Sequence, residues 1–240
     1  MNCRSDFAMD DQFWIGLLEI LGVNIVLSGD NAVVIAMAAR SLPQRQQRAA
    51  IILGSGAAIV LRVILTTVAA SVLAQPYLKL AGALLLLWIG IQLMLPHEKD
   101  GGSVGQTASH LAAAVRTILV ADLVMSLDNV IAVAAAAHGD FVLLTLGLAI
   151  SIPLIIFGST ALLKLMDRFP LIINLGAGLL GYVAGEMLLS EPVLAVYVQG
   201  RLAHLAIPWG GAAVVLAAGT WISSKIAAKR RRNAVGDEPR

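Results

Sequence analysis

Polar side chains recur at matching places in two long apolar stretches of this 240-residue chain. The stretch LSGDNAVVIA carries Asp30 and Asn31, and the stretch MSLDNVIAVA carries Asp128 and Asn129. An aspartate at the centre of a membrane helix costs about 2.5 to 3.5 kcal/mol on insertion scales. Such residues are retained where they face a wet or protein-lined interior and have partners, which makes them candidates for chemistry.

Acids outnumber bases within the apolar stretches. Arg62 also lies in an apolar segment of the chain. It is able to neutralise only one acid, either as a structural counter-ion or as a substrate contact. The remaining negative charge has to be relieved by protonation or by a bound cation. The acids in question are Glu19, Asp30, Asp122, Asp128 and Glu186.

The candidate ligands in these stretches are all oxygen atoms of carboxylates, amides and hydroxyls. Oxygen ligands suit a hard divalent ion such as Mn²⁺, Mg²⁺ or Ca²⁺, whereas Zn²⁺ or copper calls for histidine or cysteine. The single cysteine, Cys3, and four histidines in or beside predicted loops offer no such cluster. We therefore expect no resident cofactor, and a cation as substrate. The amides and hydroxyls in the set are Asn24, Ser28, Asn31, Ser126 and Asn129.

Helical phase separates the two residues of each Asp-Asn pair. At 100° per residue, Asn24, Ser28 and Asn31 share one stripe, while Asp30 lies roughly 100° to 120° away from it. The second stretch repeats this pattern. Either a second helix supplies partner ligands, or the SGD and SLD turns open locally. The glycine of SGD favours opening, and the leucine of SLD does not.

The elements that position these residues are predicted to be membrane helices. The chain is 58% hydrophobic and 13% charged, with a mean hydropathy of +0.84, which is typical of an integral membrane protein. The apolar runs are long and continuous, which favours helices over the short alternating strands of a barrel. The predicted fold is an all-α membrane protein with helices over 13–38, 50–74, 77–95, 111–137, 141–163, 170–189 and 205–224.

The first six predicted helices form an internal repeat. A shift of 98 residues superimposes the polar positions of the two stretches, and the shift shrinks by a few residues further along. Because each copy has three helices, an odd number, the copies insert in opposite directions, as in many secondary transporters. The matched pairs are Asn24 with Asp122, Ser28 with Ser126, Asp30 with Asp128, Asn31 with Asn129, Gly54 with Gly147, and Gly90 with Gly185.

Basic residues indicate the orientation of the helices. If the N-terminus is outside, 13 of the 17 lysines and arginines lie inside and three lie outside, with Arg62 in the membrane. Translation from Met1 or from Met9 is compatible with this arrangement. The predicted segments are an outer tail 1–12, repeats 13–95 and 111–189 joined by an inner linker 96–110, an outer loop 190–204, a seventh helix 205–224 and a basic inner tail 225–240.

The partners follow from the same features. The basic tail is expected to lie against anionic lipid of the inner leaflet. We expect the chain to lie in a bilayer and to take a divalent cation as its substrate. No nucleic-acid partner is predicted, and the sequence leaves the oligomeric state open.

The motifs resemble those of a known family. EILGVNIVLSGDN from Glu19 to Asn31, the basic segment RSLPQRQQR, and GSGAAIVLR ending at Arg62 resemble the first half of the TerC family of integral membrane proteins. ADLVMSLDN from Ala121 to Asn129 resembles the second half. The similarity covers about residues 12 to 224 and is strongest to the short bacterial branch.

The resemblance implies manganese export from a bacterial cell across its inner membrane. It carries the ion-handling role to Glu19, Asn24, Asp30, Asn31, Asp122, Asp128 and Asn129, and Glu186 is added to this set. Repeat two has Thr117 where repeat one has Glu19, so that acid is not duplicated.

Two other functions stay open. The first is a non-transporting membrane assembly or stress-response factor, because some TerC proteins are associated with assembly or with tellurium resistance. The second is an intramembrane aspartyl protease, in which two aspartates share a proton as general acid and base. The absence of a glycine before Asp128 disfavours protease chemistry. We therefore predict a protein that is not an enzyme.

Overall fold

Every regular element that the structure describes is an α-helix. In this computed structural model the described part of the chain contains no β-strand. The all-α class predicted from the sequence is therefore confirmed, while the seven-span inverted arrangement stays a prediction. The described residues are 14–22, 29–73, 75, 77–95, 104–136, 141–195, 198 and 200–236.

The helices divide into two compact units. The first unit combines residues 1–76 with 102–165, and the second combines residues 77–101 with 166–240. Each unit therefore contains helices from both predicted repeats.

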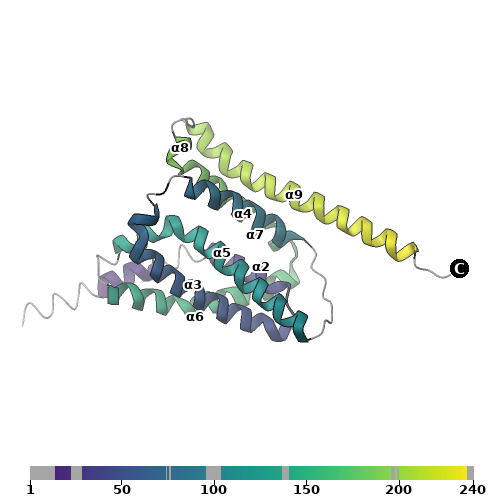
Figure 1. Cartoon of the computed structure of the whole chain (residues 1–240), viewed down its shortest axis with the longest axis horizontal. Helices are drawn as coiled ribbons and strands as arrows, with labels where there is room; N and C mark the ends of the chain where they lie inside the picture. The colour runs from purple at the N-terminus through teal and green to yellow at the C-terminus, as the bar shows by residue number, and fades with distance from the viewer. Residues whose placement is uncertain are drawn as a thin grey trace, which may run out of the picture. The chain divides into compact units, whose positions relative to one another are not determined.

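The first unit is built from α2 (Gly29–Arg40), α3 (Gln44–Leu73), α5 (Val104–Ala136) and most of α6 (Phe141–Arg168), together with a helical segment over 14–22. Helix α5 packs against both α3 and α2 (Figure 1). Pro43 precedes α3, where its missing N–H is not needed. Residues 23–28 lie outside the described chain, so the predicted helix over 13–38 is seen only as two helical segments.

Two glycines of the first unit make closely similar contacts. A Cβ atom on Gly54 of α3 would come within 2.7 Å of the Ile118 side chain of α5. A Cβ atom on Gly147 of α6 would collide with the Ile20 side chain of the segment 14–22. Gly54 matches Gly147 in the predicted repeat, and Ile20 matches Ile118 at the shift of 98 residues. The second helix of each predicted repeat thus receives an isoleucine from the first helix of the other repeat.

The second unit is a bundle of α4 (Leu78–Met94), α7 (Leu171–Leu189) and α9 (Arg201–Gly236), with the four-residue α8 (Pro192–Ala195) between the last two. Helices α4 and α7 pack together, and each also packs against α9. Figure 1 shows α9 continuing past the ends of α4 and α7. Gly181 and Gly185 of α7 lie directly on the α9 backbone, because a Cβ on either would clash with it. Small residues permit this close approach, which dispersion forces then stabilise.

A buried glutamate caps the beginning of α4. Glu191 is 1% exposed, and its Oε1 accepts the Tyr77 N–H at 3.2 Å while its Oε2 accepts the Leu80 N–H at 3.3 Å. Tyr77 itself has a left-handed backbone, φ 64°, and its side chain makes no capping hydrogen bond. The first-turn N–H groups of a helix lack partners within the helix, so a carboxylate there is stabilising.

Five helices of the described chain are long and apolar enough to cross a membrane, judged by length and composition alone. Helix α4 is a sixth, shorter apolar helix. The five candidate spans are Gln44–Thr66, Ala108–Leu127, Thr145–Arg168, Leu171–Leu189 and Arg201–Lys229.

Removing the Glu191 carboxylate is expected to destabilise the second unit. Glu191→Ala leaves two N–H groups at the start of α4 without their acceptor and should lower the free energy of unfolding by about 1.5 to 3 kcal/mol. Glu191→Gln keeps one acceptor oxygen and should cost less. Reversible unfolding in mixed micelles, followed by circular dichroism, measures both values. Equal stability of wild type and Glu191→Ala would contradict the capping role.

Candidate functional site

The site begins with two polar residues one helical turn apart on α5. Asp122 and Ser126 are separated by four residues, so both side chains lie on the same face of the helix. Helix α3 packs against α5 and brings Arg62 to this face. Three polar side chains from two helices therefore meet inside the first unit.

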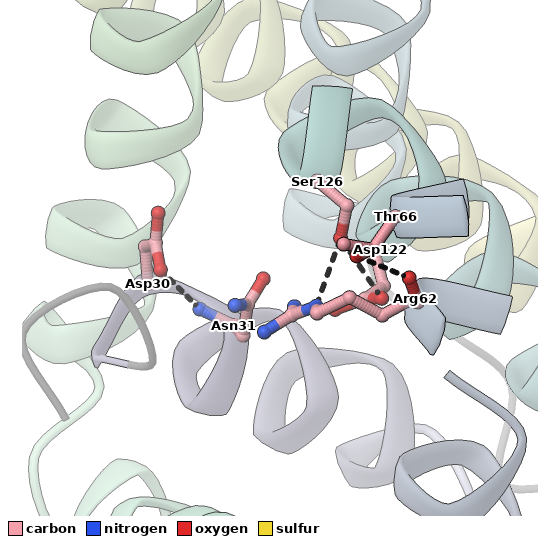
Figure 2. A network of polar contacts seen from close by, with 6 residues as sticks. All are labelled: Asp30, Asn31, Arg62, Thr66, Asp122 and Ser126. Atoms are coloured by element: carbon pink, nitrogen blue, oxygen red, sulfur yellow. Dashed lines mark hydrogen bonds and ion pairs between the residues drawn. The ribbon is translucent and has the colours of Figure 1, made fainter. Parts of the chain in front are cut away.

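A buried ion pair joins these residues. The Arg62 Nη2 donates to Asp122 Oδ1 at 2.5 Å, and the Arg62 Nε donates to Ser126 Oγ at 3.1 Å. The Ser126 hydroxyl in turn donates to Asp122 Oδ2 at 3.3 Å. Both carboxylate oxygens of Asp122 thus have hydrogen-bond partners. On α3, Thr66 Oγ1 donates to the Arg62 carbonyl at 2.8 Å (Figure 2).

All three members of the ion-pair network are withdrawn from solvent. Arg62 is 2% exposed, Asp122 is 7% exposed and Ser126 is fully buried. Desolvation makes each buried charge costly, so a buried pair adds little net stability, yet removing one partner leaves an uncompensated charge. The pair therefore fixes which side chains meet without being needed to hold two apolar helices together.

The beginning of α2 contributes the third group of polar residues to the site, after α3 and α5. Asp30 lies in the first turn of α2, and its Oδ1 accepts the Asn31 N–H at 2.7 Å. Negative charge is favoured at this end of a helix, because the first-turn N–H groups point toward it. Figure 2 shows the Arg62 guanidinium between Asn31 on one side and Asp122 and Ser126 on the other, with Asp30 beyond Asn31. Asn31 is buried and Asp30 is partly buried.

The described structure shows whether the helix opens locally at the second Asp-Asn motif. Helix α5 is continuous through the SLD turn, so the second motif does not open locally. Position 128 then lies about 120° around the helix from position 122, and the two aspartates of α5 occupy different faces. For the first motif the question stays open, because Ser28 of the SGD turn and the residues before it, 23–27, lie outside the described chain.

The remaining predicted site residues lie elsewhere on the described helices or outside the described structure. Glu19 is exposed on the segment 14–22, and Asn129 is partly exposed on α5. Glu186 is exposed on α7 in the second unit. Asn24 and Ser28, and the side chain of Asp128, lie outside what the structure describes.

Sequence reasoning identified Arg62 as an intramembrane base but not its partner, because helical phase relates residues only within one helix. It also overlooked Glu191, which follows the predicted sixth helix and looked like an ordinary loop acid. A polar residue directly before Pro192, at the end of an apolar run, is the signal that marks it.

The described chain holds no cluster of three or more histidine, cysteine, aspartate or glutamate side chains placed to bind a metal. The polar set instead combines two carboxylates with an amide, a hydroxyl and one guanidinium. Such a set is able to bind a hard cation through oxygens, or to hold a fixed charge balance. The long apolar helices and this buried charged network define a multi-pass integral membrane protein.

Comparison with known proteins identifies the family. The profile described as "Integral membrane protein TerC family" matches residues 9–227, nearly the whole chain. The protein therefore belongs to the TerC family of integral membrane proteins. No solved structure shows significant similarity to the chain.

Relatives with similar sequences are bacterial membrane proteins. Membrane protein YjbE of Bacillus subtilis (strain 168) is 46% identical over 79% of this chain and 86% of its own length. Membrane protein YceF of the same organism is 29% identical over 72% of this chain and 69% of its own. The inner membrane protein YoaE of Escherichia coli (strain K12) is 30% identical over 71% of this chain and 36% of its own. These names are those of membrane proteins and state no enzyme activity.

Replacing the hydroxyl at the centre of the network is expected to destabilise the first unit. Ser126→Ala removes the acceptor for Arg62 and the donor to Asp122, and should cost about 1 to 2 kcal/mol in the free energy of unfolding. Ser159→Ala is the matched control, because Ser159 is equally buried and, within the described chain, its hydroxyl donates to the Ile155 carbonyl of its own helix. Unfolding of the two variants in mixed micelles compares them. Equal losses would show that the Ser126 hydroxyl adds nothing to the network.

Proposed function

We propose that this protein is a transporter that exports a hard divalent cation, manganese first among them, through the polar site of the first unit. The observation that carries the proposal is the buried charge balance on α2, α3 and α5. Asp30 and Asp122 supply two negative charges and Arg62 supplies one positive charge. Intramembrane ionisable residues of this kind mark ion pathways by default, because their burial is costly.

The chemistry of the ligands favours a hard cation. Asp30, Asn31, Asp122 and Ser126 present only oxygen acceptors together with an amide N–H₂, and the proposed set extends to Asp128 and Asn129 of α5. Mg²⁺, Ca²⁺ and Mn²⁺ prefer such oxygens, while softer metals prefer sulfur or imidazole. Manganese is the member of this group that resemblance to the TerC family implies.

The inverted repeat belongs to the same proposal. In a two-fold related pair, a contact from the first copy to the second recurs from the second copy to the first. The contacts of Gly54 with Ile118 and of Gly147 with Ile20 have this reciprocal form. They support an arrangement in which the first helices of the two repeats approach one site from opposite directions.

Neutralising Asp30 is expected to reduce transport strongly. Asp30→Asn keeps the size of the side chain but removes a negative charge that attracts the cation, and we expect at least about a tenfold fall in the initial rate of Mn²⁺ uptake by everted membrane vesicles. Asp167→Asn is the matched control, because Asp167 is exposed near the end of α6. Its rate should equal that of the wild type.

The outcome separates the proposal from its main alternative. Unchanged Mn²⁺ uptake in Asp30→Asn vesicles would contradict the role of Asp30 in the site. No uptake above that of vesicles lacking the protein would contradict cation transport. A non-transporting assembly or stress-response factor would then explain the protein better, particularly if loop changes abolished its phenotype. Equal sensitivity of cells lacking the protein to every divalent ion would contradict manganese as the preferred substrate.

We propose further that the C-terminal end of α9 lies at the inner surface of the bacterial cell membrane. Helix α9 has 36 residues and is about 54 Å long, which exceeds the roughly 30 Å hydrocarbon core. Lys225 lies 3.7 Å from the centre of the Trp221 ring, a pairing that suits the membrane interface. The exposed Lys225 and Lys229 begin the basic tail, which would attract anionic lipid.

Cysteine labelling tests this orientation. In a Cys3→Ser background, Ser190→Cys marks the predicted outer loop and Ala228→Cys marks the predicted inner tail, both at exposed positions. In spheroplasts, a membrane-impermeant maleimide should modify the first variant and should reach the second only after the membrane is permeabilised. The opposite pattern would reverse the proposed orientation.

A further inference from the structure

Arg62 and a transported cation would compete for the same oxygen atoms on α5. Two of the proposed ligands on α5, the Asp122 carboxylate and the Ser126 hydroxyl, are already bound by the Arg62 guanidinium. The second Asp122 oxygen accepts the hydroxyl hydrogen of Ser126. A metal ion that takes these oxygens as ligands has to replace Arg62 on them.

We infer that Arg62 is a built-in competitor of the transported cation, which must displace the guanidinium to reach Asp122 and Ser126. The inference rests on the proposed function and names a positioning residue within it. Arg62 is not a ligand in this view. Its part is to set how tightly the α5 side of the site holds the cation.

The chemistry of arginine makes the competition exclusive. A guanidinium stays protonated in proteins, so Arg62 cannot leave Asp122 by losing its proton and has to move. A divalent cation within about 4 Å of the same guanidinium would be strongly repelled, because charges interact over short distances with little screening in a buried site. The Arg62 guanidinium and the transported cation therefore bind the Asp122 carboxylate in turn.

This ion pair occurs in only one of the two comparisons that the predicted repeat allows. The position matching Asp122 is Asn24, and the shift that relates Gly54 to Gly147 relates Arg62 to Ile155. Ile155 is buried in α6. The first unit thus has the isoleucine-on-glycine contact twice but the charged pair once. A feature confined to one half of a repeated framework points to a role other than holding the helices together.

The surroundings of Arg62 give the displaced guanidinium another set of acceptors. In the view of Figure 2 the end of the Arg62 side chain points toward Asn31 of α2. Asp30 directly precedes Asn31 in the first turn of α2. A short movement of one long side chain would transfer its charge from α5 toward α2, from the second predicted repeat to the first.

Binding of Mn²⁺ alone to the purified full chain, measured by isothermal titration calorimetry, tests the competition. Arg62→Met removes the competitor and is expected to lower the Kd for Mn²⁺ by about tenfold or more. Arg62→Lys retains a charge but loses the two-pronged contact with Asp122 and Ser126, so its Kd should fall severalfold. The matched control is Arg116→Met, an exposed arginine of the same helix as Asp122, with an unchanged Kd.

A double variant shows whether the effect acts through Asp122. Asp122→Asn removes the carboxylate for which the two cations compete, so adding Arg62→Met should then change the Kd by less than about twofold. The rise in unfolding temperature on adding Mn²⁺ should also be larger in Arg62→Met than in the wild type. A merely structural arginine would lower the unfolding temperature without enlarging that rise.

The possible failures are distinguishable. If the wild type binds Mn²⁺ and neither Arg62→Met nor Arg62→Lys binds it more tightly, the role of Arg62 is contradicted and the proposed function stands. If Arg62→Met does not fold, the Kd of Arg62→Lys decides the question. A wild type that binds no Mn²⁺ would contradict the proposed function and this inference together.

Discussion

The buried pair of Arg62 and Asp122 is the interaction on which the arrangement of polar groups in the first unit depends. It determines which face of α5 meets α3, because turning either helix would strand a charge among apolar side chains. It draws Ser126 into the same network, and it leaves the guanidinium beside Asn31 at the start of α2. One charged contact thus sets the geometry of side chains from three helices.

The apolar framework tolerates this pair because its own contacts are close and use small residues. Ile118 packs against Gly54, and Ile20 packs against Gly147. In the second unit the backbone of α9 packs against Gly181 and Gly185. In lipid, helix association relies on such close packing, since the surrounding chains are as apolar as leucine. Packing therefore supplies the cohesion, and the charged network supplies the selectivity among possible arrangements.

The sequence predicted the helices better than it predicted their partners. Long apolar runs gave 77–95 and 170–189, close to the observed Leu78–Met94 and Leu171–Leu189. Helices α3 and α9 extend further than predicted, since polar ends such as QRQQR continue a helix beyond the apolar run. The pairing of Arg62 with Asp122, 60 residues away, depends on how two helices pack, which no periodicity within either helix encodes. The capping of α4 by Glu191 escaped prediction for the same reason.

A transport site has to bind its ion tightly enough to capture it and loosely enough to release it. Several unopposed carboxylates in a low-dielectric interior would hold a divalent cation too strongly to let it go. With Arg62 beside Asp122, the charge carried by Asp30, Asp122 and Arg62 together is −1 rather than −2. If the Arg62 guanidinium returns to Asp122 as the transported ion leaves, the Asp122 carboxylate is never buried without a positive partner. Under the proposed function, the arginine is therefore what makes a buried acidic site reversible.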